Sequence, residues 1–165
     1  MILEVLRELT DYLNDPTNGV AAKLATTPRD AGDPLPTLGT IADETRNNAV
    51  AQQYLPSTPG IAVNIQQVPL LDPHTVQIDA DGDAIVIIRY GVAAADTKDA
   101  TRNTSYVLRA IARSLRSFNR STHTRNGIAI YSCLDLRLLQ LWQPKEDQVM
   151  TGAALGTWRF RDTVP

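Results

Sequence analysis

The sequence predicts an α+β domain in which a mostly antiparallel sheet of about four to five strands packs against an N-terminal helix and one long helix. Apolar residues follow helical spacing at 2–13 and 98–119, whereas the segments after Gly60 and from Gly127 onward show the patterns of strands. A long stretch at 26–60 fits neither pattern. Because 165 residues is about the length of one domain, we expect a single domain with an extended loop.

The N-terminal helix is predicted from apolar residues at spacings of three and four. These residues share one helix face and are Ile2, Val5, Leu6, Leu9 and Leu13. The stretch NDP at 14–16 supplies a stop signal. After it, VAAKLA at 20–25 is compatible with one or two further helical turns.

The loop at 26–60 is rich in proline, glycine and polar residues. Loops of this length in compact domains are usually functional or become ordered by a partner. Within the loop, Thr40 has Asp43 three residues later, which is a variant of the capping box and predicts a short helix at 41–54. We interpret the whole interval as an extension of the domain and not as a boundary between two domains.

The predicted strands begin after Gly60, where IAVNIQQV at 61–68 alternates apolar and polar residues. Two further strands, HTVQID and AIVIIRYGV, flank an acidic stretch. GIAIYSCLDLRLLQLW at 127–142 and GTWRFRD at 156–162 close the chain as strands, and the one long helix at 98–119 lies between the two groups.

The acidic stretch places Asp79, Asp81 and Asp83 at alternate positions. An EF-hand loop starting at Asp79 requires glycine at its sixth position and glutamate at its twelfth, but Ala84 and Tyr90 stand there. We therefore predict a β-hairpin whose two-residue loop is Asp81-Gly82, since glycine accepts the positive φ that such loops need. The predicted register sets Ile78 opposite Ile85 and Val76 opposite Ile87. A weak surface cation at the hairpin tip is the alternative, and the acidic tip is a candidate contact for a basic surface on a neighbouring subunit.

The long helix carries the clearest functional signal. Its apolar residues lie within about 120° of arc, while its arginines lie within about 60° on nearly the opposite side. These arginines, the arginine stripe, are Arg102, Arg109, Arg113, Arg116 and Arg120. No acidic residue occurs from Ala100 to Leu134, so the i,i+4 carboxylates that usually accompany a solvated helix are missing. Three interpretations remain open: the stripe lines a channel for DNA, it docks onto an acidic part of another subunit or partner, or it is a solvated face.

Charge is divided unequally along the chain. Residues 1–99 hold 14 acidic and 6 basic residues, a net charge of −8, and residues 100–165 hold 4 and 10, a net charge of +6. Such a division favours a basic surface for nucleic acid or complementary surfaces that bring copies of the protein together.

Signatures of catalysis are weak. His74 and His123 are the only histidines, neither has the spacing of a zinc site, and no phosphate-binding glycine loop occurs, so no metal or cofactor is predicted. A triad of His123 with Ser121 or Ser132 and an aspartate is the remaining enzymatic alternative. Cys133 is the only cysteine, which excludes an internal disulfide and indicates a small buried apolar group.

Membrane and export signals are also weak. The longest apolar runs, such as AIVII at 84–88, are far shorter than the roughly 20 residues of a membrane helix. The start MILEVLRELTDYLND carries acidic residues where a signal peptide has a basic end. We expect a chain that is neither membrane-bound nor secreted by the usual route.

The order of elements is similar to that of a known family. An amphipathic helix beginning almost at Met1, an extended loop ending in LPSTPGIAVNI, a hairpin, a helix in DATRNTSYVLRAIARSLRSF and a closing strand pair ending in GTWRFRDTVP resemble the tail-terminator and tail-completion proteins of tailed bacteriophages. The resemblance covers most of the chain, and it brings no catalytic residue because the family has none. The loop at 26–60 is longer than the family leads us to expect.

The resemblance implies a structural virion protein and not an enzyme. It implies a homo-oligomeric ring, expected to be a hexamer, at the head-proximal end of the tail, where the ring ends tail polymerisation and joins the head-tail connector. The implied partners are tail tube and sheath proteins, connector proteins and the genomic DNA in the channel. The implied location is the tail or neck of the virion, assembled in the host cytoplasm. Another neck or head-tail adaptor protein, a small DNA-binding accessory protein and a small enzyme are the alternatives.

Overall fold

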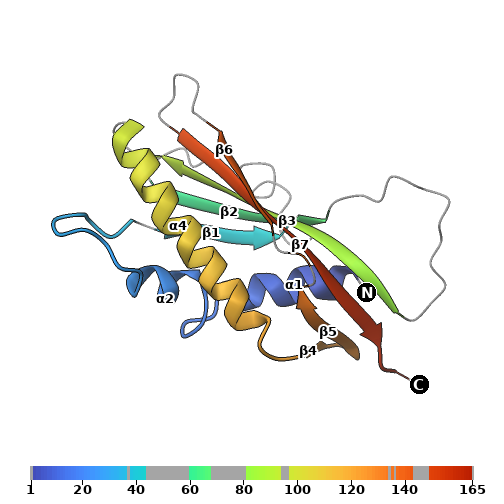
Figure 1. Cartoon of the computed structure of the whole chain (residues 1–165). Coiled ribbons are helices and arrows are strands. Elements are labelled where there is room, and N and C mark those ends of the chain that lie inside the picture. The colour runs from blue at the N-terminus through green and yellow to red at the C-terminus, as the bar shows by residue number, and fades with distance from the viewer. Residues whose placement is uncertain are drawn as a thin grey trace.

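The computed structural model describes residues 2–36, 38–43, 60–67, 81–93, 97–133, 135, 137–142 and 149–164. Three helices are present in this part of the chain, α1 (Ile2–Leu13), α2 (Val20–Ala25) and α4 (Thr97–Phe118). Its strands are β1 (Leu38–Asp43), β2 (Gly60–Gln67), β3 (Asp81–Ala93), β4 (His123–Arg125), β5 (Ile128–Cys133), β6 (Arg137–Trp142) and β7 (Val149–Asp162). Figure 1 shows the strands as one twisted sheet, with α4 crossing it and α2 beside α4.

The described strands form a seven-stranded sheet in the order β1-β2-β3-β7-β5-β4, with β6 also paired to β7. Strands β1 and β2 run parallel, and every other pair is antiparallel. The α+β class with a mostly antiparallel sheet is therefore confirmed, although the sheet has more strands than the four to five expected. Strands β1 and β4 were not predicted because they are short edge segments whose sequences carry little strand signal, and the strand predicted at 127–142 divides into β5 and β6.

Strand β7 is the centre of this sheet. Along one edge β7 pairs with the full length of β3, from Asp81 opposite Arg161 to Ala93 opposite Val149. Along the other edge it pairs first with β6 and then with β5. The apolar stretch at 127–142, predicted as one strand, is thus two strands that follow each other along the same edge of β7.

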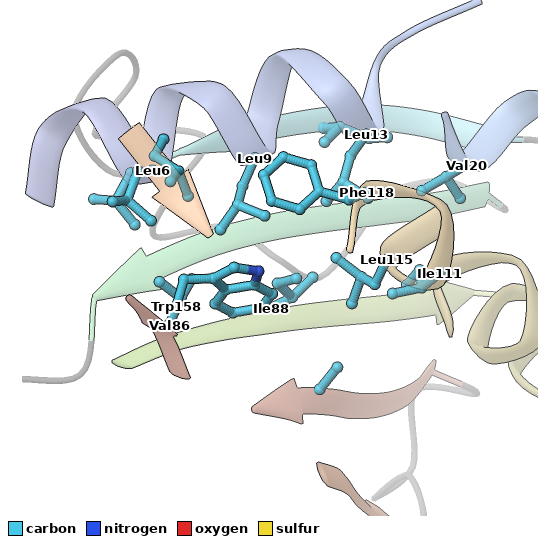
Figure 2. Packing of buried hydrophobic residues seen from close by; sticks show 14 of the residues in the cluster. Leu6, Leu9, Leu13, Val20, Val86, Ile88, Ile111, Leu115, Phe118 and Trp158 are labelled. Atoms are coloured by element: carbon cyan, nitrogen blue, oxygen red, sulfur yellow. The ribbon is translucent and has the colours of Figure 1, made fainter. Parts of the chain in front are cut away.

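The helices pack on one set of alternating strand residues. In β3 these are Ala84, Val86 and Ile88, and in β7 they are Ala154, Trp158 and Phe160, all buried in the core. Helix α1 adds Val5, Leu6, Leu9 and Leu13, and α4 adds Val107, Ile111, Leu115 and Phe118. Figure 2 shows Leu9, Leu115, Phe118 and Trp158 meeting between α1, α4 and the strands. Burial of these two amphipathic faces explains why both helices begin and end within a residue or two of their predicted bounds.

Trp158 is the largest fully buried side chain, and a glycine makes room for it. A Cβ added at Gly156 would meet the indole ring of Trp158, and it would also lie 2.9 Å from Cys133 Sγ. Cys133 itself is half-buried and packs against the core, as its interpretation as a small apolar group required. Burial raises the pKa of the Cys133 thiol, so its reactive thiolate form is disfavoured.

The predicted hairpin around Asp81-Gly82 is wrong. Both residues lie inside β3 and pair with Arg161 and Phe160 of β7. Ile87 has Gln66 of β2 on one side and Leu155 of β7 on the other, which leaves no place for Val76 beside it. The Asp-Gly turn signal is local, and the long-range pairing with β7 overrides it. The other half of the predicted hairpin, residues 76–80, lies outside the described residues.

The helix predicted at 41–54 is also corrected at its start. Residues Leu38–Asp43 form β1, which pairs with β2. The Asn14 side chain at the end of α1 donates a hydrogen bond to the Ile41 carbonyl, 3.2 Å away, and this contact holds β1 beside α1. Residues 44–54 lie outside the described part. The beginning of the long loop, residues 26–36, is irregular as expected.

The true two-residue hairpin loop is Asn126-Gly127, between β4 and β5. Both residues have positive φ, 49° and 78°, as this kind of turn requires. The C-terminal segment closes against the same turn, since the Thr163 N–H and hydroxyl both donate to the Gly127 carbonyl, at 2.8 and 2.6 Å. This turn positions His123 and Arg125, the two polar residues of β4 that face α1.

Candidate functional site: the outer surface of α4

The first half of the arginine stripe is bound within the chain. Arg102 Nη1 lies 2.9 Å from Asp99 Oδ1, one helical turn away, and 3.6 Å from Asp33 Oδ1. Asp33 belongs to residues 26–36, which we name the strap because this segment follows α2 and bonds to Arg102, Tyr106 and Arg109 of α4. Only 23% of the Arg102 side chain is exposed. Its guanidinium is therefore part of the attachment of the strap.

Tyr106 is a second attachment point for the strap. Its hydroxyl donates a 2.7 Å hydrogen bond to Asp33 Oδ2 and accepts a 3.3 Å hydrogen bond from the Asp30 N–H. The bond to the Asp33 carboxylate raises the pKa of the Tyr106 phenol, because only the neutral phenol can donate it. Tyr106 and Arg102 thus hold the same carboxylate from two successive turns of α4.

Arg113 fastens α2 to α4. Its Nη1 donates to the Lys23 carbonyl and to Thr27 Oγ1, both at 3.1 Å. One residue further along α4, the Ser114 hydroxyl donates a 2.8 Å bond to the Asn18 carbonyl. These bonds satisfy carbonyl groups at the two ends of α2, so Arg113 supports the fold.

Arg102 and Arg113 therefore have partners within their own chain, although α4 supplies them with no carboxylate at i,i+4. The nearby acidic residue Asp99 comes just before the acid-free stretch, and the other partners come from residues 18–33. Spacing along one helix does not reveal partners that arrive from elsewhere in the fold.

The remaining arginines of the stripe, Arg109, Arg116 and Arg120, are exposed. Arg109 makes one long hydrogen bond, 3.5 Å to the Pro28 carbonyl. The side chains of Arg116 and Arg120 form no hydrogen bond or ion pair with any residue that the structure describes. We name these three residues the exposed arginines of α4.

Three arginines on other elements have carboxylate partners. Arg125 Nη1 lies 3.2 Å from Glu8 Oε2 and 2.6 Å from Asp11 Oδ2, which joins β4 to α1. Arg159 lies 3.2 Å from Asp83, and Arg137 lies 2.7 Å from Asp135. The Asp135 carboxylate raises the pKa of Arg137. These three arginines therefore differ from the exposed arginines of α4, which have no carboxylate partner among the described residues.

Asp81 and Asp83 of the acidic stretch do not form a hairpin tip. Asp81 and Asp83 stand at the start of β3, in register with Arg161 and Arg159 of β7. The Asp83 carboxylate accepts a hydrogen bond from Arg159 Nε. Asp79 lies outside the described residues. The described part of the stretch is thus the end of a strand whose charge is offset by the neighbouring strand.

The enzymatic alternative falls at the junction of α1 and β4. Ser121 Oγ lies 3.4 Å from His123 Nε2, and Glu8 Oε1 lies 3.5 Å from His123 Nδ1, which has the order of a triad. However, His123 Nε2 is also 2.9 Å from the Phe118 carbonyl oxygen. A carbonyl oxygen only accepts, so Nε2 must carry a proton to bond it and then has no lone pair for the Ser121 proton. This geometry favours a structural histidine.

Aromatic packing supports the structural role of His123. Its ring stacks on Phe118 with a centroid separation of 3.8 Å and meets Tyr12 edge to face at 5.3 Å. Phe118 is fully buried. This cluster was missed at the level of the sequence, although Asn126-Gly127, the strongest short hairpin signal in the chain, marks the strand that carries it.

The described part of the chain shows neither a metal site nor a membrane-spanning helix. Within the described ranges, no group of three or more His, Cys, Asp or Glu side chains is arranged to hold a metal ion. None of the described helices is long and apolar enough to cross a membrane. No model of a protein family matches the chain, and no curated protein sequence matches it either.

Proposed function

We propose that this chain is a structural protein of a tailed bacteriophage that assembles into a ring at the head-proximal end of the tail. The ring ends polymerisation of the tail tube and offers a surface for the head-tail connector. Six copies are the expected number, and the neighbours are tube, sheath and connector proteins. The location is the tail or neck of the virion.

The observation that carries the proposal is the order of elements. In the structure an amphipathic N-terminal helix (α1) comes first, two strands (β2 and β3) precede the one long helix (α4), and antiparallel strands (β4 to β7) follow it, with α2 and β1 as further elements between α1 and β2. This is the order on which the resemblance to tail-terminator and tail-completion proteins rests, except that β2 and β3, which pair with each other, take the place of the predicted hairpin.

The distribution of charge gives the proposal further support. A ring with head-to-tail contacts closes by joining two different patches of each subunit. The N-terminal and C-terminal parts of the chain carry net charges of −8 and +6, from 14 acidic against 6 basic and 4 against 10 residues. Opposite charges on different parts of one subunit favour such contacts over self-pairing of one patch.

The decisive experiment removes the gene from the phage that carries it. We expect tails of uncontrolled length that fail to join heads, because polymerisation continues when its terminator is absent. Supplying the wild-type chain from a plasmid should restore one tail length. Tails of normal length that remain unjoined would instead identify a head-tail adaptor, and normal infectious particles would contradict a virion role.

A small enzyme is the rival from a different class, and Ser121 tests it. Ser121 is exposed, and its only described side-chain contact is the 3.4 Å approach to His123. We expect Ser121→Ala to leave tail length and infectivity unchanged. A loss of function with an intact fold would show that the hydroxyl has a chemical role and would contradict a purely structural protein.

A further inference from the structure

We propose that the exposed arginines of α4 form a contact surface for the phosphate backbone of double-stranded DNA. This inference rests on the proposed function, which brings DNA past the protein, and it narrows the arginine stripe from five residues to three. Arg102 and Arg113 are removed from the candidate surface because the strap and α2 occupy their guanidinium groups.

The surroundings of these arginines contain little negative charge. Helix α2 lies against α4, as the bonds from Arg113 to Lys23 and Thr27 show, and residues 16–29 contain no acidic residue. Residues 100–134, which include most of α4, contain none either. The same region adds Lys23 and Arg29 as further basic residues. Two neighbouring segments therefore present basic residues without acidic ones, which produces a local positive potential on a chain of net charge −2.

The geometry fits a row of phosphates. Arg109 and Arg116 lie on one side of α4 and are separated by about 10 Å of its axis at 1.5 Å per residue, and Arg120 lies in the turn two residues after the helix ends. At about 3.4 Å of axis per phosphate, the separation of the two helical arginines corresponds to roughly three phosphates along one strand of a duplex. Two guanidinium groups on a rigid helix and a third just beyond its end make a surface that positions a backbone without reading bases.

An acidic surface of a second copy is the competing partner, and the described carboxylates do not favour it. Eight of them are already engaged within the chain. Glu8 and Asp11 bind Arg125, Asp33 and Asp99 bind Arg102, Asp83 binds Arg159, Asp135 binds Arg137, and Asp15 and Asp162 accept backbone N–H groups. A partner copy would have to break these contacts to use those eight carboxylates, whereas DNA phosphates are available without that cost.

The partial charge at the end of α4 explains only some of the exposed arginines. The C-terminus of a helix carries partial negative charge, which stabilises arginines in its last turn, such as Arg116. Arg109 lies more than two turns before the end of α4 and gains nothing from this effect. A solvated helix usually supplies carboxylates at i,i+4 for such a residue, and this one does not.

The test measures binding of a labelled duplex of mixed sequence by fluorescence anisotropy across a series of salt concentrations. We expect the wild-type chain to bind with an affinity that falls steeply as salt rises. Arg116→Gln with Arg120→Gln should weaken binding at every salt concentration and reduce the slope of log K against log salt by about 2, close to one per lost phosphate contact.

The matched control is Arg137→Gln with Arg159→Gln, which removes the same charge from arginines that have carboxylate partners. This control should keep the wild-type slope. Arg116→Lys with Arg120→Lys should also keep it, because lysine contacts phosphate as a point charge. This conservative variant separates a lost contact from a damaged helix if the glutamine variant folds poorly.

Three outcomes would overturn the inference: no binding at low salt, equal losses in the two glutamine variants, or competition by polyglutamate as effective as competition by unlabelled duplex. The last outcome would identify an acidic protein surface as the partner. Because the assay uses the isolated chain, an absence of DNA binding would not contradict the proposed ring. A chain that binds DNA without forming rings would contradict only the proposed function.

Discussion

The junction of α1 with β4 and the outer surface of α4 both present arginines, but they use the charge in different ways. At the junction, Arg125 binds Glu8 and Asp11, and His123 stacks on the buried Phe118. At the end of α4, the side chains of Arg116 and Arg120 have no partner among the described residues. The difference shows that a count of charges cannot separate an arginine that holds the fold from one that is available to a partner.

The largest expected effect comes from removing the apolar base of the junction. Phe118→Ala deletes a fully buried ring that stacks on His123 and meets Tyr12 at 5.1 Å. We expect a loss of about 3 to 5 kcal/mol in the free energy of unfolding, measured by urea denaturation. A loss below about 1 kcal/mol would mean that Phe118 is not part of the core that joins α4, α1 and β4.

The turn that carries the junction gives the next effect. Gly127 has a φ of 78°, and an added Cβ would meet the Val164 side chain. We expect Gly127→Ala to cost about 2 kcal/mol, from left-handed strain together with this contact. Gly32 is the matched control, since it has a φ of 89° and no atom within 4 Å of an added Cβ. Gly32→Ala should cost only about 1 kcal/mol, and equal losses would show that the Val164 contact carries no energy.

Arg125 and Arg116 test the comparison directly. Arg125→Gln breaks two ion pairs of a side chain that is 24% exposed, and we expect a loss of about 1 kcal/mol in the free energy of unfolding that shrinks at high salt. Arg116→Gln should change it by less than about 0.5 kcal/mol. For DNA binding we expect the opposite order, with a larger loss from Arg116→Gln than from Arg125→Gln. A larger loss of stability from Arg116→Gln would place that residue in the fold as well.

The smallest effect is a pH dependence at the strap. The hydrogen bond to Asp33 raises the pKa of Tyr106, so this contact stabilises the fold fully below the ordinary phenol pKa of 10.0. The contribution is lost as the pH rises through the higher folded pKa, because a phenolate beside the Asp33 carboxylate is repelled. We expect wild type to lose more stability than Tyr106→Phe above pH 10.0, measured by thermal unfolding. Parallel curves for the two proteins would contradict a hydrogen bond between Tyr106 and Asp33.

The helices could be predicted from the sequence because their signals are local and agree with the fold. The apolar spacing in α1 and α4 is the same property that buries Leu9 and Leu115, so the sequence pattern and the packing in the fold both favour helices at these positions. The strand at 61–68 was predicted for the same reason, since its alternation fits the position of β2.

The turns and the arginines were harder because their outcome depends on distant residues. Asp81-Gly82 has turn chemistry, but β7 supplies a partner strand for both residues, and Asn126-Gly127 forms the turn instead. Arg102 has no acidic residue following it on its helix, but Asp33 reaches it from the strap. Which carboxylate binds an arginine depends on how segments far apart in the chain come together. The periodicity of one helix carries no information about that arrangement.

The mass of the purified chain, alone and after incubation with tail tubes, tests the central claim most directly. The account predicts that size-exclusion chromatography with light scattering finds an assembly of about six times the 18.1 kDa of one chain, at least when tubes are present. Negative-stain images should then show closed rings at one end of each tube. A single 18.1 kDa species under both conditions, with bare tube ends, would contradict it.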